Sequence, residues 1–441
     1  MTNRSHTLKS LEILGFRGQR RKIKLNFDRH ANFIIGRNGT GKTTLINLLN
    51  AAISLDINIL RKIDFDQLEI KFKLDGSNVT PSMTLKKLNG KNERSIVYSF
   101  KSAHRGSSRE YVAFRVAPRK MRLSHSGAGA FTHYATMEDP ADKKAIFEEI
   151  SKLIKVTWLS LRRRREDAVD IEDEFDDGSY QNSVSDVDQR LEFVFNQMAG
   201  YFSRLDRVAA EENVQFQKQW FIALLTPMLS NHHLHIHEID SDTEKKNIEQ
   251  IFRSFGVPQS EVNEKLISHF KKVDEFKNRS SDQPYRGFEE ISTLVNAIRL
   301  HNLVDKWQNL QKKIKEIYRP KELFKEKSSS MLYSKSVEVN SSNSPYISHR
   351  SGTTIPVSEL SSGEKQLLIF LSETILQEGA RHIFLADEPE LSLHVEWQEQ
   401  LVPSLLEVNP NAQVVFATHS PDIVGYFQKS VVKMENLIDD I

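Results

Sequence analysis

The chain has 441 residues, with 61 Lys and Arg against 59 Asp and Glu, a net charge of +2 and no cysteine. Its length suits two or three domains, and its balanced charge does not demand a nucleic-acid or membrane partner. The lack of cysteine excludes disulfides, thiolate metal sites and cysteine catalysis, and no apolar run approaches the roughly 20 residues of a membrane span. The N-terminus lacks the apolar region of a signal peptide, so we expect a cytoplasmic protein without a membrane partner.

The first part of the chain predicts a phosphate-binding loop. Strands are expected at residues 8–16 and 21–27 around the turn Gly15-Phe-Arg-Gly18, followed by a buried strand at 31–35 and a helix at 43–55. Between that strand and helix, residues 36–44 read GRNGTGKTT and fit the pattern G-x-x-x-x-G-K-[ST]. Strand, glycine loop and helix together form the context that a phosphate cradle requires.

Each part of the loop has an expected role. The glycines let backbone N–H groups point at phosphate oxygens, Lys42 places a charge on the β- and γ-phosphates, and Thr43 offers a hydroxyl to Mg²⁺. The expected nucleotide-binding residues are Arg37, Asn38, Gly39, Thr40, Gly41, Lys42, Thr43 and Thr44. The expected ligands are therefore the β- and γ-phosphates of a nucleotide and Mg²⁺; the family resemblance described below implies that this nucleotide is ATP.

The rest of this first lobe, residues 1–161, reads as a β-subdomain and a helix. Alternating apolar and polar residues predict strands at 66–74, 95–100 and 111–116. Residues 120–140 have no regular pattern and are interpreted as irregular. A helix at 143–155 and a buried strand at 156–161 are expected to close the lobe.

Residues 162–320 read as a helical insertion. Four arginines at 162–165 precede an acidic stretch at 166–177, a block pattern typical of solvated tracts. Apolar residues at alternating steps of four and three then predict a helix with a coiled-coil-like seam: Val187, Leu191, Val194, Met198, Tyr201, Leu205 and Val208. Shorter helices at 245–256 and 260–278 precede a second long helix, from Ile291 to Ile317, expected to end before Pro320.

The last lobe, residues 321–441, holds the second half of a nucleotide site. After a β-like stretch with a candidate strand at 331–339, residues 360–366 (LSSGEKQ) open an apolar helix in which Ser361 or Ser362 caps the start. An apolar strand then ends in Asp387 and Glu388, where Asp387 can hold the Mg²⁺ shell and Glu388 can polarise a water. A further buried strand ends at His419, whose imidazole can reach a γ-phosphate or that water.

These motifs, in this order, resemble those of ABC-type ATPases. Residues 36–43, 360–364, 385–389 and His419 are similar to the Walker A, signature, Walker B and switch-histidine motifs. The turn at 15–18, the sequence DEPELSLH at 387–394 and the large helical gap are similar to the RecF, SMC and OLD branch, and to AAA-type ATPase domains, rather than to transporters. The resemblance implies an α/β head with a mixed sheet, an antiparallel β subdomain and a largely helical insertion.

The resemblance also implies how the site works. In that branch two heads sandwich ATP, so Ser361, Ser362, Gly363 and Glu364 of one copy would face the nucleotide held by Lys42 of another. The implied partners are thus a second copy of the chain and, because no nuclease domain follows His419, a separate effector protein such as a nuclease. This arrangement resembles stand-alone ATPase subunits of antiphage systems such as PARIS and Septu.

Three weaker signals leave alternatives open. The histidines at 232–237 suit either a metal site or a polar strand edge. Arg162 to Arg165 can contact DNA phosphates, an acidic partner or the acidic stretch that follows. Arg17 can touch nucleotide or serve its own turn.

Two functions remain from the sequence. The first is a Mg-dependent ATPase whose paired heads control an effector in antiphage defence. The alternative is a DNA-repair ATPase of the RecF or SMC type that binds duplex DNA when ATP is bound. Salt-sensitive DNA binding by the isolated chain would distinguish the second from the first.

Overall fold

The computed structural model describes residues 6–19, 22–74, 79–89, 94–101, 108–120, 132–137, 139–159, 186–225, 240–278 and 287–438. The chain divides into two compact units, one made of Met1–Ala199 and Leu323–Ile441, the other of Gly200–Glu322. The second unit falls almost wholly within residues 162–320, the predicted helical insertion. We call the first the head unit and the second the helical unit.

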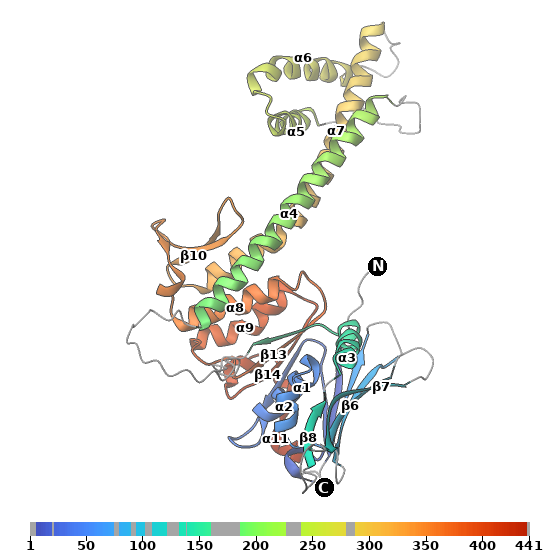
Figure 1. Ribbon diagram of the computed structural model, residues 1–441. Coiled ribbons are helices and arrows are strands. Elements are labelled where there is room, and N and C mark those ends of the chain that lie inside the picture. The colour runs from blue at the N-terminus through green and yellow to red at the C-terminus, as the bar shows by residue number, and fades with distance from the viewer. Residues whose placement is uncertain are drawn as a thin grey trace, which may run out of the picture. The chain divides into compact units, whose positions relative to one another are not determined.

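A five-stranded parallel sheet lies at the centre of the head unit (Figure 1), in the order β15-β3-β14-β13-β9. Its strands are β3 (Ala31–Ile35), β9 (Val156–Leu159), β13 (His382–Asp387), β14 (Ala412–Ala417) and β15 (Val431–Lys433). All six residues of β14 are buried, as expected where helices cover both faces of a parallel sheet. The carboxyl ends of β3, β14 and β13 meet at one edge, the usual place for a ligand in such sheets.

A second sheet has seven antiparallel strands in the order β2-β1-β4-β5-β6-β7-β8. They are β1 (Thr7–Leu14), β2 (Lys22–Asn26), β4 (Gln67–Lys73), β5 (Ser82–Asn89), β6 (Arg94–Lys101), β7 (Ser108–Lys120) and β8 (Thr132–Met137). The interpretation of residues 120–140 as irregular was wrong for β8. That strand pairs along β7 from Arg115 opposite Met137 to Lys120 opposite Thr132, and such a partner is not visible in the local sequence.

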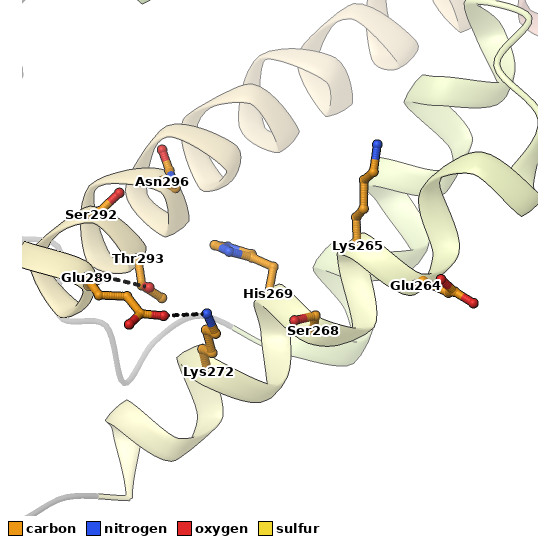
Figure 2. Close-up of a pocket in the computed structure, with 9 residues that line it drawn as sticks. All are labelled: Glu264, Lys265, Ser268, His269, Lys272, Glu289, Ser292, Thr293 and Asn296. Carbon is orange, nitrogen blue, oxygen red and sulfur yellow. Dashed lines mark hydrogen bonds and ion pairs between the residues drawn. The ribbon is translucent and has the colours of Figure 1, made fainter.

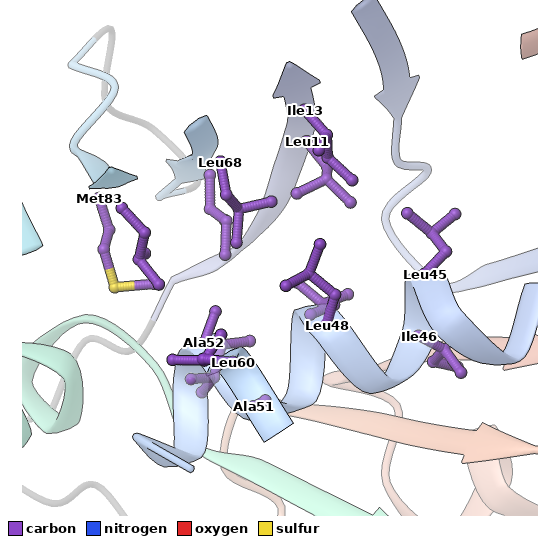
Figure 3. Packing of buried hydrophobic residues seen from close by; sticks show 14 of the residues in the cluster. Leu11, Ile13, Leu45, Ile46, Leu48, Ala51, Ala52, Leu60, Leu68 and Met83 are labelled. Carbon is purple, nitrogen blue, oxygen red and sulfur yellow. The ribbon is translucent and has the colours of Figure 1, made fainter. Parts of the chain in front are cut away.

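Helix α1 (Lys42–Ser54) packs between the two sheets. It contacts β13 and β14 on one side. Toward the other sheet it presents Leu45, Leu48 and Ala52, which belong to the same buried cluster as Leu11 and Leu68 (Figure 3). Helices α2 (Ile57–Lys62) and α3 (Pro140–Leu153) add to this cluster. The helix that begins in the phosphate loop is thereby fixed on two sides.

One amide links the two sheets directly. The fully buried side chain of Gln413, on β14, accepts a hydrogen bond from Leu8 N at 2.7 Å and donates to Leu8 O at 3.0 Å. It also donates to Asp28 O at 2.7 Å. The Gln413 side chain thus makes the hydrogen bonds with the N–H and C=O groups of Leu8 that a neighbouring strand would make. These bonds link the two sheets at a fixed distance.

The C-terminal lobe adds a small sheet and several helices to the head unit. The sheet contains β10 (Lys335–Val339), β11 (Pro345–His349) and β12 (Thr354–Ile355). The helices are α8 (Ser362–Ile375), α9 (Val395–Val408), α10 (Pro421–Val424) and α11 (Met434–Ile438), and short 3₁₀ turns lie at Phe16–Gly18, Val357–Glu359 and Gln428–Ser430. The predicted helix after the signature motif is confirmed. The candidate strand at 331–339 is correct only for its second half.

Two long helices, α4 (Asp186–Leu225) and α7 (Phe288–Met331), each contribute to both units. The expected stop before Pro320 was wrong, since α7 continues to Met331. A proline removes one N–H from the helix ladder, but the following turns contain the fully buried Phe324 and Ser328. Burial of these residues stabilises the helix beyond the point at which the low helix propensity of proline would otherwise end it.

In the helical unit, α4 and α7 run antiparallel. The Phe216 ring lies 5.6 Å from that of Trp307, and Lys313 Nζ lies 2.9 Å from Glu212 Oε2. Along α4 the predicted seam is buried from Leu191 to Tyr201, whereas Val208 is exposed. The buried positions that continue it are Phe202, Ala209 and Phe216, seven residues apart on one face of the helix. This face lies one residue beyond the predicted positions 201 and 208.

Helices α5 (Ser241–Ser254) and α6 (Gln259–Lys277) complete the helical unit and confirm the two shorter helices predicted there. Their buried residues Ile248, Ile251 and Leu266 share a cluster with Trp307. None of the helices in the described ranges is both long and apolar enough to cross a membrane.

Candidate nucleotide-binding site

The phosphate loop joins β3 to α1 in a conformation that its glycines permit. Gly39 and Gly41 have φ angles of 83° and 98°, in the left-handed region that favours glycine. A Cβ atom at Gly41 would lie 3.2 Å from the Phe16 ring, whereas Gly39 faces open space. Arg17 donates a hydrogen bond from its Nη1 to Gly39 O, so its guanidinium fastens the loop.

Lys42 lies at the centre of this loop. Its Nζ donates to Gly36 O at 2.8 Å and to Arg37 O at 3.3 Å, and the residue is 5% exposed. Burial lowers the pKa of Lys42, and attraction to nearby carboxylates, Glu388 first, opposes that shift. A buried ammonium group surrounded by loop peptides is a site prepared for an anion.

The Walker A and Walker B motifs meet although they lie far apart in sequence. Thr43 Oγ1 donates a hydrogen bond to Asp387 Oδ1 at 3.2 Å across 344 positions. This contact follows from strand order, because β14 alone separates β3 from β13. A hydroxyl and a carboxylate oxygen at this distance are the hard oxygen ligands that Mg²⁺ prefers, so the two residues fit the ion expected here.

Glu388 leaves the end of β13 in a strained backbone conformation. Its φ angle is 51°, uncommon for a residue with a side chain, and its N–H donates to Ala417 O at 2.7 Å. Such strain occurs where a side chain must be held in a set direction. Glu388 and Asp387 are both half-buried at the edge where Lys42 lies.

His419 follows β14 at the same edge, and a residue without an expected role anchors it. The imidazole of His419 is exposed, but its main-chain N–H donates to Glu390 Oε1 at 2.7 Å. Ser420 N donates to the same oxygen at 3.1 Å. The sequence signal was the last glutamate of Asp-Glu-Pro-Glu, residues 387–390, which was used only as a mark of resemblance.

The signature segment begins α8 with a capping box. Ser361 Oγ accepts from Glu364 N at 3.3 Å, and Glu364 Oε2 accepts from Ser361 N at 2.9 Å. Lys335 Nζ lies 2.7 and 2.8 Å from the two carboxylate oxygens of Glu364. Burial works against the charge on Glu364, but hydrogen bonds from Lys335 and Ser361 outweigh it and lower its pKa. Glu364 therefore shapes this turn, while Ser362 beside it is exposed.

Gly363 serves close packing. A Cβ atom on it would lie 2.2 Å from Ser392 O, closer than real side chains approach. The signature helix can therefore touch the segment after Walker B only if this residue is glycine. The resemblance implied that Gly363 faces nucleotide held by another copy, and sequence reasoning did not predict this contact.

Glu435, on α11, is a second residue that sequence reasoning missed. Its Oε1 accepts a hydrogen bond from Arg37 N at 2.7 Å, and this bond lowers its pKa. A cavity of about 800 Å³ adjoins the contact, lined among others by Arg37, His419, Lys433 and Glu435. The residue lies 398 positions from the loop, so no local pattern could have indicated it.

The structure brings the loop, Asp387, Glu388 and His419 to one edge of the parallel sheet. Within the residues described, no hydrogen bond or ion pair connects Ser361, Ser362, Gly363 or Glu364 to residues 36–44 of the same chain. The arginines at 162–165 and the histidines at 232–237 lie outside the described residues. In the described ranges, no group of three or more His, Asp or Glu side chains is placed to hold a metal ion.

The helical unit has a polar cavity of its own, of about 500 Å³, between α6 and α7 (Figure 2). Lys272 of α6 and Glu289 of α7 are 2.7 Å apart at its edge. His269 extends from α6 into this space, and its buried Nε2 has no hydrogen-bond partner in the part of the chain that the structure describes. Burial and the nearby Lys272 lower the pKa of His269, which favours the neutral ring.

Phosphate loop, paired carboxylates and strand-end histidine define a P-loop nucleotide-binding site of the ATPase kind. Comparison with known proteins then gives the family. Residues 7–424 match the AAA ATPase domain, and the chain belongs to this family. The expectation of an ATP-binding ATPase domain is thereby confirmed. So is the predicted α/β head with an antiparallel β subdomain and a large helical insertion. The central sheet, expected to be mixed, is instead parallel throughout its five strands.

Relatives match over short stretches. The "Retron Vc95 probable ATPase" of Vibrio cholerae serotype O1 biovar El Tor is 32% identical over 101 residues, 20% of each chain. The "Retron Ec83 probable ATPase" of Escherichia coli is 31% identical over 85 residues, 17% of this chain and 16% of that protein. The matches thus span a fifth or less of these relatives.

An Smc head domain with an extended coiled coil, from Pyrococcus furiosus, aligns over 97% of this chain and 93% of its own. Its TM-score is 0.39 at 10% identity. A structural similarity this weak carries no argument about function, which we therefore infer from the residues of this chain.

Proposed function

We propose that the chain binds and hydrolyses ATP with Mg²⁺, and that its heads pair around the nucleotide to control a separate effector. The contact between Thr43 Oγ1 and Asp387 Oδ1, 3.2 Å long, carries this proposal. It brings a Walker A hydroxyl to a Walker B carboxylate beside the buried Lys42. Mg²⁺ bound to these oxygens would neutralise charge on the phosphates.

The residues divide the work as follows. Lys42 binds the phosphates, and its buried ammonium gains a partner when they arrive. Glu388 accepts a proton from the attacking water, since its strained backbone turns it out of the strand. His419 donates to the γ-phosphate or orients the water from the neighbouring strand.

The signature segment supports the pairing of heads. The first turn of α8 is closed by a capping box within the chain, Ser362 is exposed on it, and no hydrogen bond to the described phosphate loop is found. A second copy could therefore present this turn to nucleotide bound by the first. The names of the two relatives place such ATPases in retrons, which agrees with a subunit that serves a larger defence system.

The test combines hydrolysis with native mass. Lys42→Ala should abolish nucleotide binding, and Glu388→Gln should bind ATP, lower kcat by about 10²–10⁴-fold and trap a paired state. Native mass of Glu388→Gln should double when Mg-ATP is added, with Lys42→Ala as the control that does not change. Normal turnover by Glu388→Gln would refute the mechanism. ATP-dependent, salt-sensitive capture of duplex DNA by the isolated chain would instead favour a repair ATPase.

A further inference from the structure

The turn that follows β13, residues 388–393, contacts both neighbouring motifs. Glu388 N donates to Ala417 O on β14 at 2.7 Å. Gln366 Nε2, on the signature helix α8, donates to Pro389 O at 2.8 Å, and Gly363 packs against Ser392. The turn is therefore attached at one end to the strand that leads to His419 and along its length to the signature helix.

Glu390 projects from this turn toward the switch histidine. One carboxylate oxygen accepts both His419 N, at 2.7 Å, and Ser420 N, at 3.1 Å. Its other oxygen, Oε2, is buried and has no hydrogen-bond partner among the described residues. Removing a carboxylate from water costs free energy unless it is hydrogen-bonded. The hydrogen bonds from the two main-chain N–H groups therefore provide most of the stabilisation of the Glu390 carboxylate in this position.

Other bonds fix the residues on either side of His419. Thr418 N donates to Ile34 O at 3.1 Å, and Ser420 Oγ donates to Gln398 Oε1 at 2.6 Å. In the described part of the chain, the bond that reaches the backbone of His419 itself comes from Glu390. Since the imidazole is exposed, the direction in which it points depends on this peptide group.

We propose that Glu390 is a positioning residue of the ATPase site. Its carboxylate sets the backbone of His419, and the turn that carries it connects that histidine to the signature helix α8. The proposal rests on the proposed ATPase function, because the role of His419 is read through hydrolysis. A catalytic group misplaced by about 1 Å can lower the rate by about 10²-fold, which gives the scale of effect.

Hydrolysis kinetics provide the first test. Glu390→Ala should lower kcat by about 30- to 100-fold and leave KM for ATP within about threefold, because the phosphate loop is untouched. Glu390→Gln keeps an oxygen that accepts both N–H groups and should stay within about threefold of wild type in kcat. Glu399→Ala, an exposed glutamate on α9, is the matched control.

A double-mutant cycle separates positioning from loss of stability. If Glu390 acts through His419, then Glu390→Ala combined with His419→Ala should be no slower than His419→Ala alone. Independent, multiplicative losses would overturn the proposal. Should Glu390→Ala not fold, Glu390→Asp replaces it, because the shorter side chain cannot reach both N–H groups.

Main-chain NMR tests the geometry without relying on catalysis. Selective ¹⁵N labelling of histidine gives 15 amide positions, and His419→Ala identifies the one that belongs to His419. Its signal should move in Glu390→Ala, move less in Glu390→Gln and stay in Glu399→Ala. An unmoved signal in Glu390→Ala would overturn the proposal and leave the ATPase standing. A wild type that cannot hydrolyse ATP would instead refute the proposed function. The NMR result would still test whether Glu390 sets the main-chain geometry of His419.

Discussion

Replacing Gly363 with alanine should damage both stability and activity. The added Cβ would lie 2.2 Å from Ser392 O and 3.3 Å from Ser392 C, and both atoms are backbone that cannot rotate away. Real Cβ atoms hardly ever approach within 3.0 Å, so α8 and the turn must separate by at least about 0.8 Å. That movement stretches the 2.8 Å bond from Gln366 Nε2 to Pro389 O beyond useful length.

The size of the effect follows from these two losses. Overpacking costs about 1–3 kcal/mol, and a lost hydrogen bond adds about 0.5–1.5 kcal/mol, so Gly363→Ala should destabilise the head unit by about 2–4 kcal/mol. Because the same turn carries Glu388 and Glu390, kcat should also fall by about 10²-fold.

Urea unfolding and ATP turnover measure these effects, and a second helical glycine is the control. Gly200, inside α4, has open space where its Cβ would be, so Gly200→Ala should raise helix stability by about 0.5–1 kcal/mol. If Gly363→Ala proves as stable and active as wild type, the close contact between α8 and Ser392 does not exist in solution.

Three further predictions concern ionisable groups. Lys42→Met should keep or raise the melting temperature of the protein without nucleotide, because burial disfavours the charged amine. It should also lose the rise in melting temperature that ATP gives the wild type, and a retained rise would contradict the assigned role of Lys42. Asp387→Asn should raise the Mg²⁺ concentration for half-maximal hydrolysis at least about tenfold, and an unchanged Mg²⁺ titration would count against its role as a ligand. Burial raises the pKa of Glu244 above its usual 4.5, so the folded state holds this proton after the unfolded chain has lost it, and stability falls as pH rises through that window. Glu244→Gln should therefore be more stable than wild type at pH 7, with the gain shrinking below about pH 4.5; an equal gain at both pH values in urea unfolding would refute this.

Local patterns predicted the phosphate loop and the strand ends that lie beside it. A glycine loop between an apolar strand and helix needs only neighbouring residues to take its shape, and β3 and α1 lie where the pattern placed them. Ser361 or Ser362 was predicted as a cap for the same reason, since capping acts within one helical turn, and the structure has Ser361 in that position. Asp387 and His419 follow buried strands whose parallel pairing brings them to one edge.

Features that depend on distant partners were not predictable. Strand β8 exists because β7 pairs with it, and α7 passes Pro320 because Phe324 is buried beyond it. The roles of Glu390 and Glu435 arise from hydrogen bonds across 29 and 398 positions. A glutamate in a turn has the same local sequence signal whether its carboxylate is solvated or anchors a neighbouring peptide.

The layout of the parallel sheet has a consequence for the order in which the protein is made. Strands β3 and β9 come from the first 159 residues, but β14 and β13, which separate them, come from residues 382–417. During synthesis β3 and β9 remain unpaired until β13 and β14 have been made, and their apolar edges are exposed to other nascent chains. The helical unit is continuous from Gly200 to Glu322 and can fold during that wait. Slow translation or a chaperone acting before β13 emerges would therefore govern the yield of active heads more than the stability of the finished protein does.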